Sequence, residues 1–140
     1  MTDDNDKVPE QFDWVHARSK CSLASVFKEL EQGVREDIDI AQSLVPPKNE
    51  LRFSVVKAVG SRFSATRVDD PFTSSLGRSV DFAYSKDRIT VYNEKDEMLF
   101  AATLTLNNKG KCRLVVNNKE LTQWEFRRMA LEKLFFGPFS

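Results

Sequence analysis

Metal-binding and nucleophilic side chains are scarce in this chain of 140 residues, which has two cysteines, Cys21 and Cys112, and one histidine, His16. The cysteines lie far apart in the sequence and neither belongs to a CxxC pair, so the spacing argues against a zinc or iron–sulfur site. Without such a pair, we expect two reduced, partly buried thiols that are not bonded to each other, as is usual in the cytoplasm.

Long hydrophobic runs are absent as well. No apolar stretch approaches the roughly 20 residues that a helix needs to cross a bilayer. Residues 1–10 are acidic and polar, with neither the basic nor the apolar region of a signal peptide. We therefore expect a cytoplasmic protein without membrane contact. Residues 1–10 are predicted to be a disordered tail, and residues 11–140 a single α+β domain.

Charge of one sign does not dominate the chain, which has 21 basic and 21 acidic residues. Residues 1–50 hold six basic and eleven acidic residues, and residues 51–140 hold fifteen and ten. Nucleic-acid-binding domains usually carry a net basic field. We therefore expect no nucleic-acid partner.

Catalytic motifs are missing too: there is no G-x-S-x-G elbow, no G-x-G-x-x-G loop and no EF-hand spacing. His16 precedes Cys21 by five positions, but a Cys–His dyad is defined by geometry and not by closeness in sequence. Asp69-Asp70 before Pro71 is explained more simply as the start of a turn. The sequence thus favours a non-catalytic protein that has no metal and no cofactor.

What the sequence does contain is regular patterning, beginning with a helix at about residues 23–44. Ser22 is a suitable N-cap, and apolar residues recur at steps of three and four. Gly33 lies beside this stripe, and we expect it to permit close approach of another element. A second helix is predicted for residues 123–136, with Thr122 and Glu125 forming a capping box. Gly137-Pro138 is expected to stop this helix, because glycine tolerates a left-handed cap and proline cannot continue a helix.

The segment between the helices alternates with a period of two. Six strands are predicted, at about residues 51–55, 62–66, 80–84, 88–91, 98–106 and 112–116. Their connections are mostly short and polar, which requires antiparallel neighbours; residues 69–78 form the one longer loop. The expected fold is α+β: an N-terminal helix, an antiparallel meander of about six strands and a C-terminal helix, with both helices on one face of the sheet.

The other face of the sheet is then left uncovered, and it is the candidate binding surface. The alternation places five side chains on it that could anchor a ligand: Arg52, Arg62, Arg88, Tyr92 and Arg113. Outward arginines are common on a solvated sheet face, which is the simpler interpretation. The alternative is a binding or self-association face, because arginine is enriched at interfaces and pairs bidentately with carboxylates.

Two functions are therefore carried forward. The first is a non-catalytic interaction module, with a protein partner or self-association through the open sheet face. The alternative is a carrier or enzyme for a small apolar ligand, held in a cavity between helix and sheet. A cavity lined by Phe53, Phe82, Tyr84 and Phe100 would favour the second, whereas a filled core would favour the first.

Overall fold

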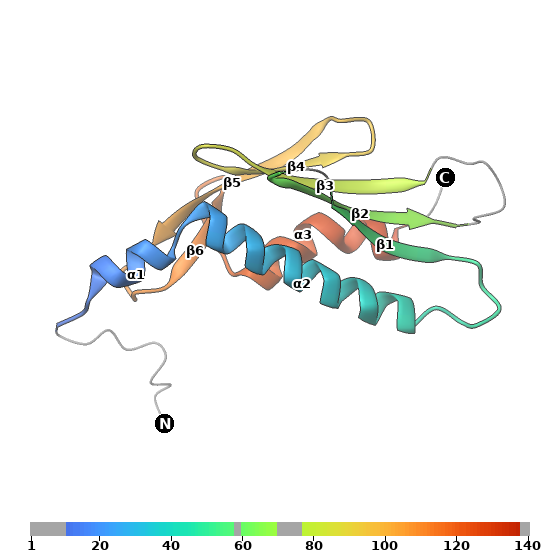
Figure 1. Ribbon diagram of the computed structural model, residues 1–140, viewed down its shortest axis with the longest axis horizontal. Helices are drawn as coiled ribbons and strands as arrows, with labels where there is room; N and C mark the ends of the chain where they lie inside the picture. Colours follow the sequence, from blue (N-terminus) through green and yellow to red (C-terminus); the bar gives the residue numbers. More distant parts are fainter. Residues whose placement is uncertain (1–10, 58–59, 70–76, 138–140) are drawn as a thin grey trace, which may run out of the picture.

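The computed structural model describes residues 11–57, 60–69 and 77–137 as an α+β fold in which the helices lie on one face of a single antiparallel sheet (Figure 1). The predicted tail at residues 1–10 lies outside the described residues. Among the described residues, no helix combines the length and the hydropathy that crossing a membrane requires.

The sheet is a meander of seven strands whose spatial order follows the sequence. The strands are β1 (Arg52–Lys57), β2 (Arg62–Val68), β3 (Arg78–Tyr84), β4 (Ile89–Asn93), β5 (Met98–Leu106), β6 (Cys112–Val116) and β7 (Lys119–Leu121). Six were predicted. The seventh, β7, is too short to show an alternation, and it is set by the turn before it: Asn117 and Asn118 both have positive φ, which a two-residue hairpin turn of this kind requires.

A bulge in β5 changes the predicted faces of that strand. Val91 pairs with Phe100, but its neighbour Tyr92 pairs with Met98, so Leu99 is an extra residue on one side of the ladder. Because side chains alternate along a strand, one extra residue moves those before it to the opposite face. Met98 was predicted to face the core and is instead exposed beside Tyr92 on the outer face.

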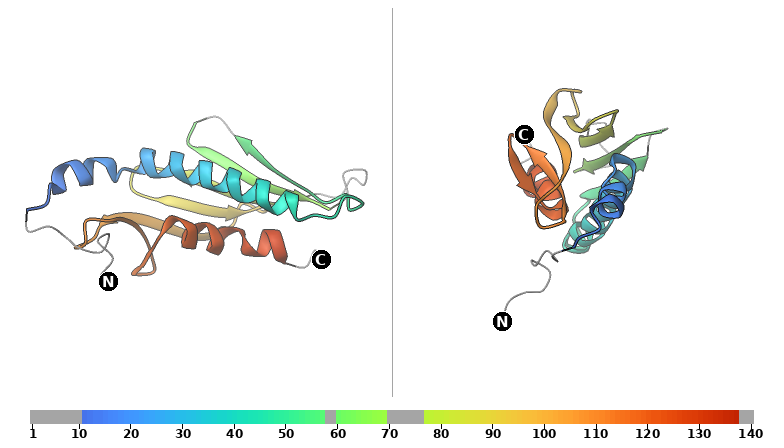
Figure 2. Two further views of the ribbon diagram at one scale, coloured as in Figure 1. Left: turned by 90° about the horizontal axis from the view of Figure 1, so that it is seen from below. Right: turned by 90° about the vertical axis from the view of Figure 1, so that its left-hand side faces the viewer.

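Two helices cover the inner face of the sheet: α2 (Leu23–Ser43) and α3 (Gln123–Phe136). The predicted N-caps are confirmed, because the Ser22 hydroxyl accepts from the Ser25 N–H and Thr122 and Glu125 form a complete capping box. The predicted stop at Gly137 is confirmed, because α3 ends at Phe136 with Gly137 as its C-cap, but the cap has φ −74° and is not left-handed. Seen from below, α2 and α3 run side by side in the same direction (Figure 2).

The segment before α2 is also a helix, α1 (Trp14–Lys20), which was not predicted. None of its residues is buried, and Trp14 and Val15 are exposed. Asp13 supplies the N-cap, its carboxylate accepting from the His16 N–H. The ring of Phe12 packs so closely on Gly110 that a β-carbon there would lie 2.5 Å from it.

The core lies between the inner sheet face and the helices, and its rings pack on one another. Phe82 stacks on Phe63 at 4.8 Å between ring centroids. Phe100 meets Phe126 of α3 edge-on at 5.4 Å. The remaining rings named for a cavity do the same: Tyr84 lies 4.7 Å from Phe27 and Phe53 lies 5.2 Å from Phe135. Phe82 and Tyr84 pack on other rings in the core, whereas Phe100 lines a hollow of about 410 Å³ beside α3 and Phe53 lines one of about 180 Å³ near β1. The four rings therefore do not line one common cavity between helix and sheet.

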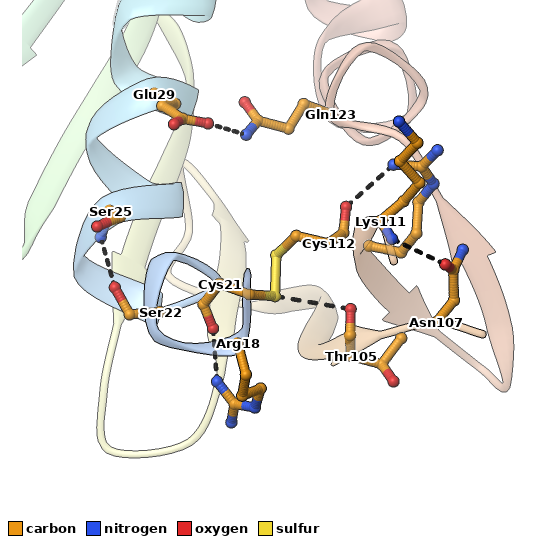
Figure 3. Close-up of a disulfide and its surroundings, with 11 residues drawn as sticks. Arg18, Cys21, Ser22, Ser25, Glu29, Thr105, Asn107, Lys111, Cys112 and Gln123 are labelled. Atoms are coloured by element: carbon orange, nitrogen blue, oxygen red, sulfur yellow. Dashed lines mark hydrogen bonds between the residues drawn. A yellow bond between two sulfur atoms is a disulfide. The ribbon is translucent and has the colours of Figure 1, made fainter. Parts of the chain in front are cut away.

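Cys21 and Cys112 form a disulfide that ties the α1–α2 junction to β6, with Cα atoms 5.4 Å apart (Figure 3). The prediction of two free thiols is therefore wrong: the spacing of 91 residues in sequence said nothing about their distance in space. Cys21 Sγ also lies 3.6 Å from the carbonyl oxygen of Thr105, a packing contact here because a disulfide sulfur carries no proton. Since disulfides persist mainly in oxidising compartments, the bond removes the argument for a cytoplasmic location that rested on reduced thiols.

Candidate interaction surface

Arg62, on β2 of the predicted binding face, already has partners within the chain. Arg62 donates to the carboxylates of Asp81 and Asp96, each at 3.0 Å, and its guanidinium lies 5.2 Å from the centre of the Tyr92 ring. The hydrogen bond to Asp81, followed by that to Asp96, raises the pKa of the Arg62 guanidinium. This cluster stabilises the cation without any ligand.

The other three predicted arginines are held locally and lie on separate parts of the sheet. Arg88 pairs with the adjacent Asp87 at 3.2 Å. Arg52 donates to the backbone carbonyls of Asn49 and Leu51, at 3.2 and 2.9 Å, and Arg113 to that of Cys112 at 3.1 Å. The structure therefore does not bring the predicted set together around one point. It brings together only Arg62 and Tyr92.

A different hollow lies on the opposite side of the molecule, between α2 and α3. This groove, called the α2–α3 groove below, has a volume of about 350 Å³. Its lining comprises Asp37, Ile40, Ala41, Leu44, Trp124, Arg127, Arg128, Leu131, Glu132, Phe135 and Phe136. A smaller hollow of about 180 Å³ shares Ala41, Leu44, Phe135 and Phe136 with it and continues it toward β1.

Large apolar side chains stand exposed along both walls of the groove. On α2, Ile40 is 61% exposed and Leu44 68%; on α3, Trp124 is 57% exposed and Phe136 73%. The floor is closed by buried Ala41 and Leu131. An exposed apolar residue is ordinary when it is alone, whereas a group of four around one groove is a pattern typical of interaction sites.

The helix period explains how α2 presents this wall. Its buried stripe runs through Val26, Leu30, Val34, Ile38 and Ala41 and faces the sheet. Gly33, Asp37, Ile40 and Leu44 follow a second row at steps of four and three, and that row faces α3. The second row was missed in the sequence, although Ile40 and Leu44 as apolar residues off the core stripe were a signal for it.

The helix α3 likewise has apolar residues on two sides. Phe126, Ala130, Leu131 and Leu134 are buried. Trp124 and Met129 are exposed. With only one layer of sheet beneath it, a helix can bury one side, so apolar residues on its remaining surface must face solvent.

An ion pair and a glycine set the separation of the two walls. Arg127 Nε donates to the Asp37 carboxylate at 2.7 Å, and both side chains are largely buried. The Arg127 side chain crosses directly over Gly33, where a β-carbon would lie 2.6 Å from its Nη1. The prediction that Gly33 permits close approach of another element is confirmed, because the Arg127 side chain of α3 packs directly on it.

A buried arginine holds the end of the groove where Phe135 and Phe136 lie. Arg67, only 9% exposed, donates through Nη1 to the carbonyls of Leu134 at 2.8 Å and Gly137 at 3.0 Å. Its Nε donates to Asp69 at 3.0 Å. A cation beside the last carbonyls of a helix stabilises that end. Phe63 and Ala65 face the core at alternate positions of β2, and continuing this alternation to residue 67 would have predicted that Arg67 is buried.

The side chains considered for catalysis or metal binding are engaged within the chain or lie outside its described part. Cys21 is half of a disulfide and so is no nucleophile, and the His16 ring is engaged by the Asp13 carboxylate. Asp69, of the Asp69-Asp70 pair, accepts from Arg67, while Asp70 lies outside the described part of the chain. Within that part, no group of three or more His, Cys, Asp or Glu side chains could hold a metal ion.

Comparison with protein-family models, with curated proteins and with solved structures gives no match to this chain. Any functional interpretation therefore depends on the α2–α3 groove and on the outer sheet face themselves.

Proposed function

We propose that the protein is a non-catalytic interaction module that docks an apolar surface of a protein partner in the α2–α3 groove. The observation that carries the proposal is the exposure of Ile40, Leu44, Trp124 and Phe136 around one groove. Each could be polar without cost to the core, because none of them is buried. Trp is also among the residues that most often dominate binding energy.

The size of the exposed apolar surface indicates what a partner must supply. The four wall side chains expose roughly 400 Å² together, and burying that area is worth about 10 kcal/mol at 25 cal/mol per Å². Association itself costs about 4–15 kcal/mol. The gain from the groove alone falls within the range of this cost, so apolar surface that the partner buries is needed for a stable complex when the cost lies at the upper end.

The two earlier hypotheses receive less support from the geometry. The arginines of the sheet face are already engaged by carboxylates or carbonyls of the same chain, so capturing a partner would mean breaking those contacts. A cavity shared by the four named aromatic rings is opposed by the stacking of Phe82 on Phe63 in the core, and Phe100 lines a separate hollow of about 410 Å³ beside α3.

Site-specific photocrosslinking tests the proposal. A benzophenone amino acid at Leu44 reports on the groove, and the same probe at exposed Met98 is the matched control on the sheet face. In the cells that make the protein, we expect a discrete protein adduct from position 44 and none from position 98. The adduct should disappear when Ile40→Asp is added. A protein adduct from position 98 and none from position 44 would show that the partner binds the sheet face and not the groove.

The same experiment separates a protein partner from a small ligand. If the groove held an apolar small molecule, position 44 would give no protein adduct, and native mass spectrometry would show the chain with a bound mass that Ile40→Asp removes. That result would replace the docking function by ligand binding.

A further inference from the structure

Resting on the proposed docking function of the α2–α3 groove, we propose that its partner is a second copy of this chain, bound about a two-fold axis with the two α3 helices antiparallel. The axis crosses the exposed side of α3 between Arg128 and Glu132, level with residue 130 along the helix.

The pattern that carries the inference is a palindrome along α3. Four groove-lining residues follow one another at intervals of four: Trp124, Arg128, Glu132 and Phe136. Residues at this spacing form one of the ridges by which helices pack. The ridge has an aromatic residue at each end and opposite charges at its centre. Reversing its direction therefore exchanges aromatic for aromatic and places each charge where its opposite stood.

A two-fold interface requires this kind of self-complementarity, because the same patch must fit itself when turned around. With the α3 helices antiparallel and centred on residue 130, Arg128 of one copy faces Glu132 of the other, and this contact occurs twice. Trp124 likewise faces Phe136, also twice. A parallel arrangement would place Arg128 against Arg128 and Glu132 against Glu132, which like-charge repulsion disfavours.

The charges on the groove face are balanced, as a self-pairing surface needs. Its lining includes two acidic residues, Asp37 and Glu132, and two basic residues, Arg127 and Arg128. Arg127 and Asp37 are engaged with each other beside the floor. Arg128 and Glu132 form only a 3.5 Å pair, with both side chains more than half exposed. Such a surface ion pair contributes little to the stability of a single chain, so each side chain can pair instead with the opposite charge of a second copy.

The area also agrees with a pair of copies. A standard interface buries about 800 Å² per partner, of which about 65% is apolar in homodimers, so roughly 500 Å² of apolar surface is needed. The four wall side chains supply roughly 400 Å² per copy. A second copy brings an equal apolar surface, which adds to the gain from the groove alone.

Charge exchange between two variants tests this geometry directly. Arg128→Glu puts two acidic side chains at positions 128 and 132, and Glu132→Arg puts two basic ones there. Each variant alone meets like charges across the axis, whereas the two mixed together meet opposite charges at both contacts. By sedimentation equilibrium we expect each single variant to dimerise at least about tenfold more weakly than the unmodified chain, and an equimolar mixture to recover most of that loss.

A second readout follows the aromatic contact and guards against misfolding. In a Trp14→Phe background Trp124 is the remaining tryptophan, because the chain has two. Its emission should shift to the blue as concentration rises, and Phe136→Glu should abolish that shift while the circular dichroism spectrum stays unchanged. Met98→Glu, a charge placed on the exposed sheet face, is the matched control and should dimerise like the unmodified chain.

Three results would overturn the inference. The first is a chain that remains monomeric up to about 1 mM. The second is a dimer whose dissociation constant neither charge variant changes, and the third is an equimolar mixture of the two variants that dimerises no more tightly than each variant alone. The photocrosslink at position 44 then separates the two proposals. An adduct with a different protein overturns the second copy but keeps the docking function, and the absence of any protein adduct with a monomeric chain overturns both.

Discussion

The outer face of the sheet and the α2–α3 groove face are both exposed, yet they are built in opposite ways. On the sheet face, charged side chains find partners within the chain: Arg62 lies between Asp81 and Asp96, and Ser64 donates to Asp81 at 2.5 Å. On the groove face, large apolar side chains stand in solvent. A polar face that satisfies its own groups has little to gain from a partner, whereas an exposed apolar face gains from every neighbour that removes water.

Residue type alone therefore does not identify the residues that bind a partner. Arginine is a common interface anchor, and the sequence pattern singled out four of them. Whether an arginine is available depends on what surrounds it, and that is decided by strand register. Arg62 reaches Asp81 because β2 and β3 pair with Arg62 opposite Ala83 and Ser64 opposite Asp81.

The largest expected effect tests whether the scaffold that presents both faces depends on the disulfide. Changing Cys21→Ser together with Cys112→Ser should lower the free energy of unfolding by about 4 kcal/mol, because the bond closes a long loop in the unfolded chain. Urea unfolding, with and without a reducing agent, measures this loss. The double variant itself should be insensitive to the reductant. A loss below about 1 kcal/mol would show that the bond constrains little.

Next in size is the buried cation that holds the groove end of α3. Arg67→Met should cost about 3 kcal/mol, since it leaves the carbonyls of Leu134 and Gly137 and the Asp69 carboxylate without their charged donor. The matched control is Arg88→Met on the sheet side, where the cost should stay within about 0.5 kcal/mol. Equal costs for the two variants would contradict the contrast between an arginine that holds the fold and one that is solvated.

The opposite end of α3 offers a smaller effect with a pH signature. Thr122→Ala should cost about 1 kcal/mol through the lost N-cap. The backbone N–H of Thr122, followed by its hydroxyl, lowers the pKa of Glu125. A carboxylate whose pKa is lowered by folding contributes stability above its unfolded value, near pH 4.3, and loses it as the pH falls through the folded value.

Thermal melting across that acid range measures this dependence. Glu125→Gln should remove the Glu125 part of the stability loss below about pH 4.3, while leaving the neutral-pH fold intact. If the acid dependence is the same in this variant as in the unmodified chain, the capping box is not the source of it.

The smallest effect is expected on the sheet face. Arg88→Ala with Arg113→Ala should change the free energy of unfolding by no more than about 0.5 kcal/mol per site, and should leave self-association unchanged. Sedimentation beside thermal melting checks both quantities. If the double variant melts normally but associates more weakly, the sheet face is the interface, and the comparison between the two faces is reversed.

Local patterns in the sequence predict most of the fold because they reflect short-range physics. Helix caps such as Ser22 and Thr122 act within a few residues, and the periods of 3.6 and 2 assign a core face to each element. The bulge at Leu99 escaped prediction because it is a property of the pairing between β4 and β5 and not of β5 alone. The candidate site escaped for a related reason: Ile40 and Leu44 become a wall only once α3 lies beside α2.

By itself, the sequence determined the order of α2, the strands β1 to β6 and α3, the N-caps Ser22 and Thr122, and most of the residues that face the sheet. Each of these depends on neighbours within about one or two turns of chain. The tertiary structure decided which distant groups meet. It joined Cys21 to Cys112, placed Arg67 beneath the end of α3, and set the two helices at the spacing that Gly33 and Arg127 allow. Contacts of this kind are fixed by how elements pack in space, and packing leaves no periodic trace in a single chain.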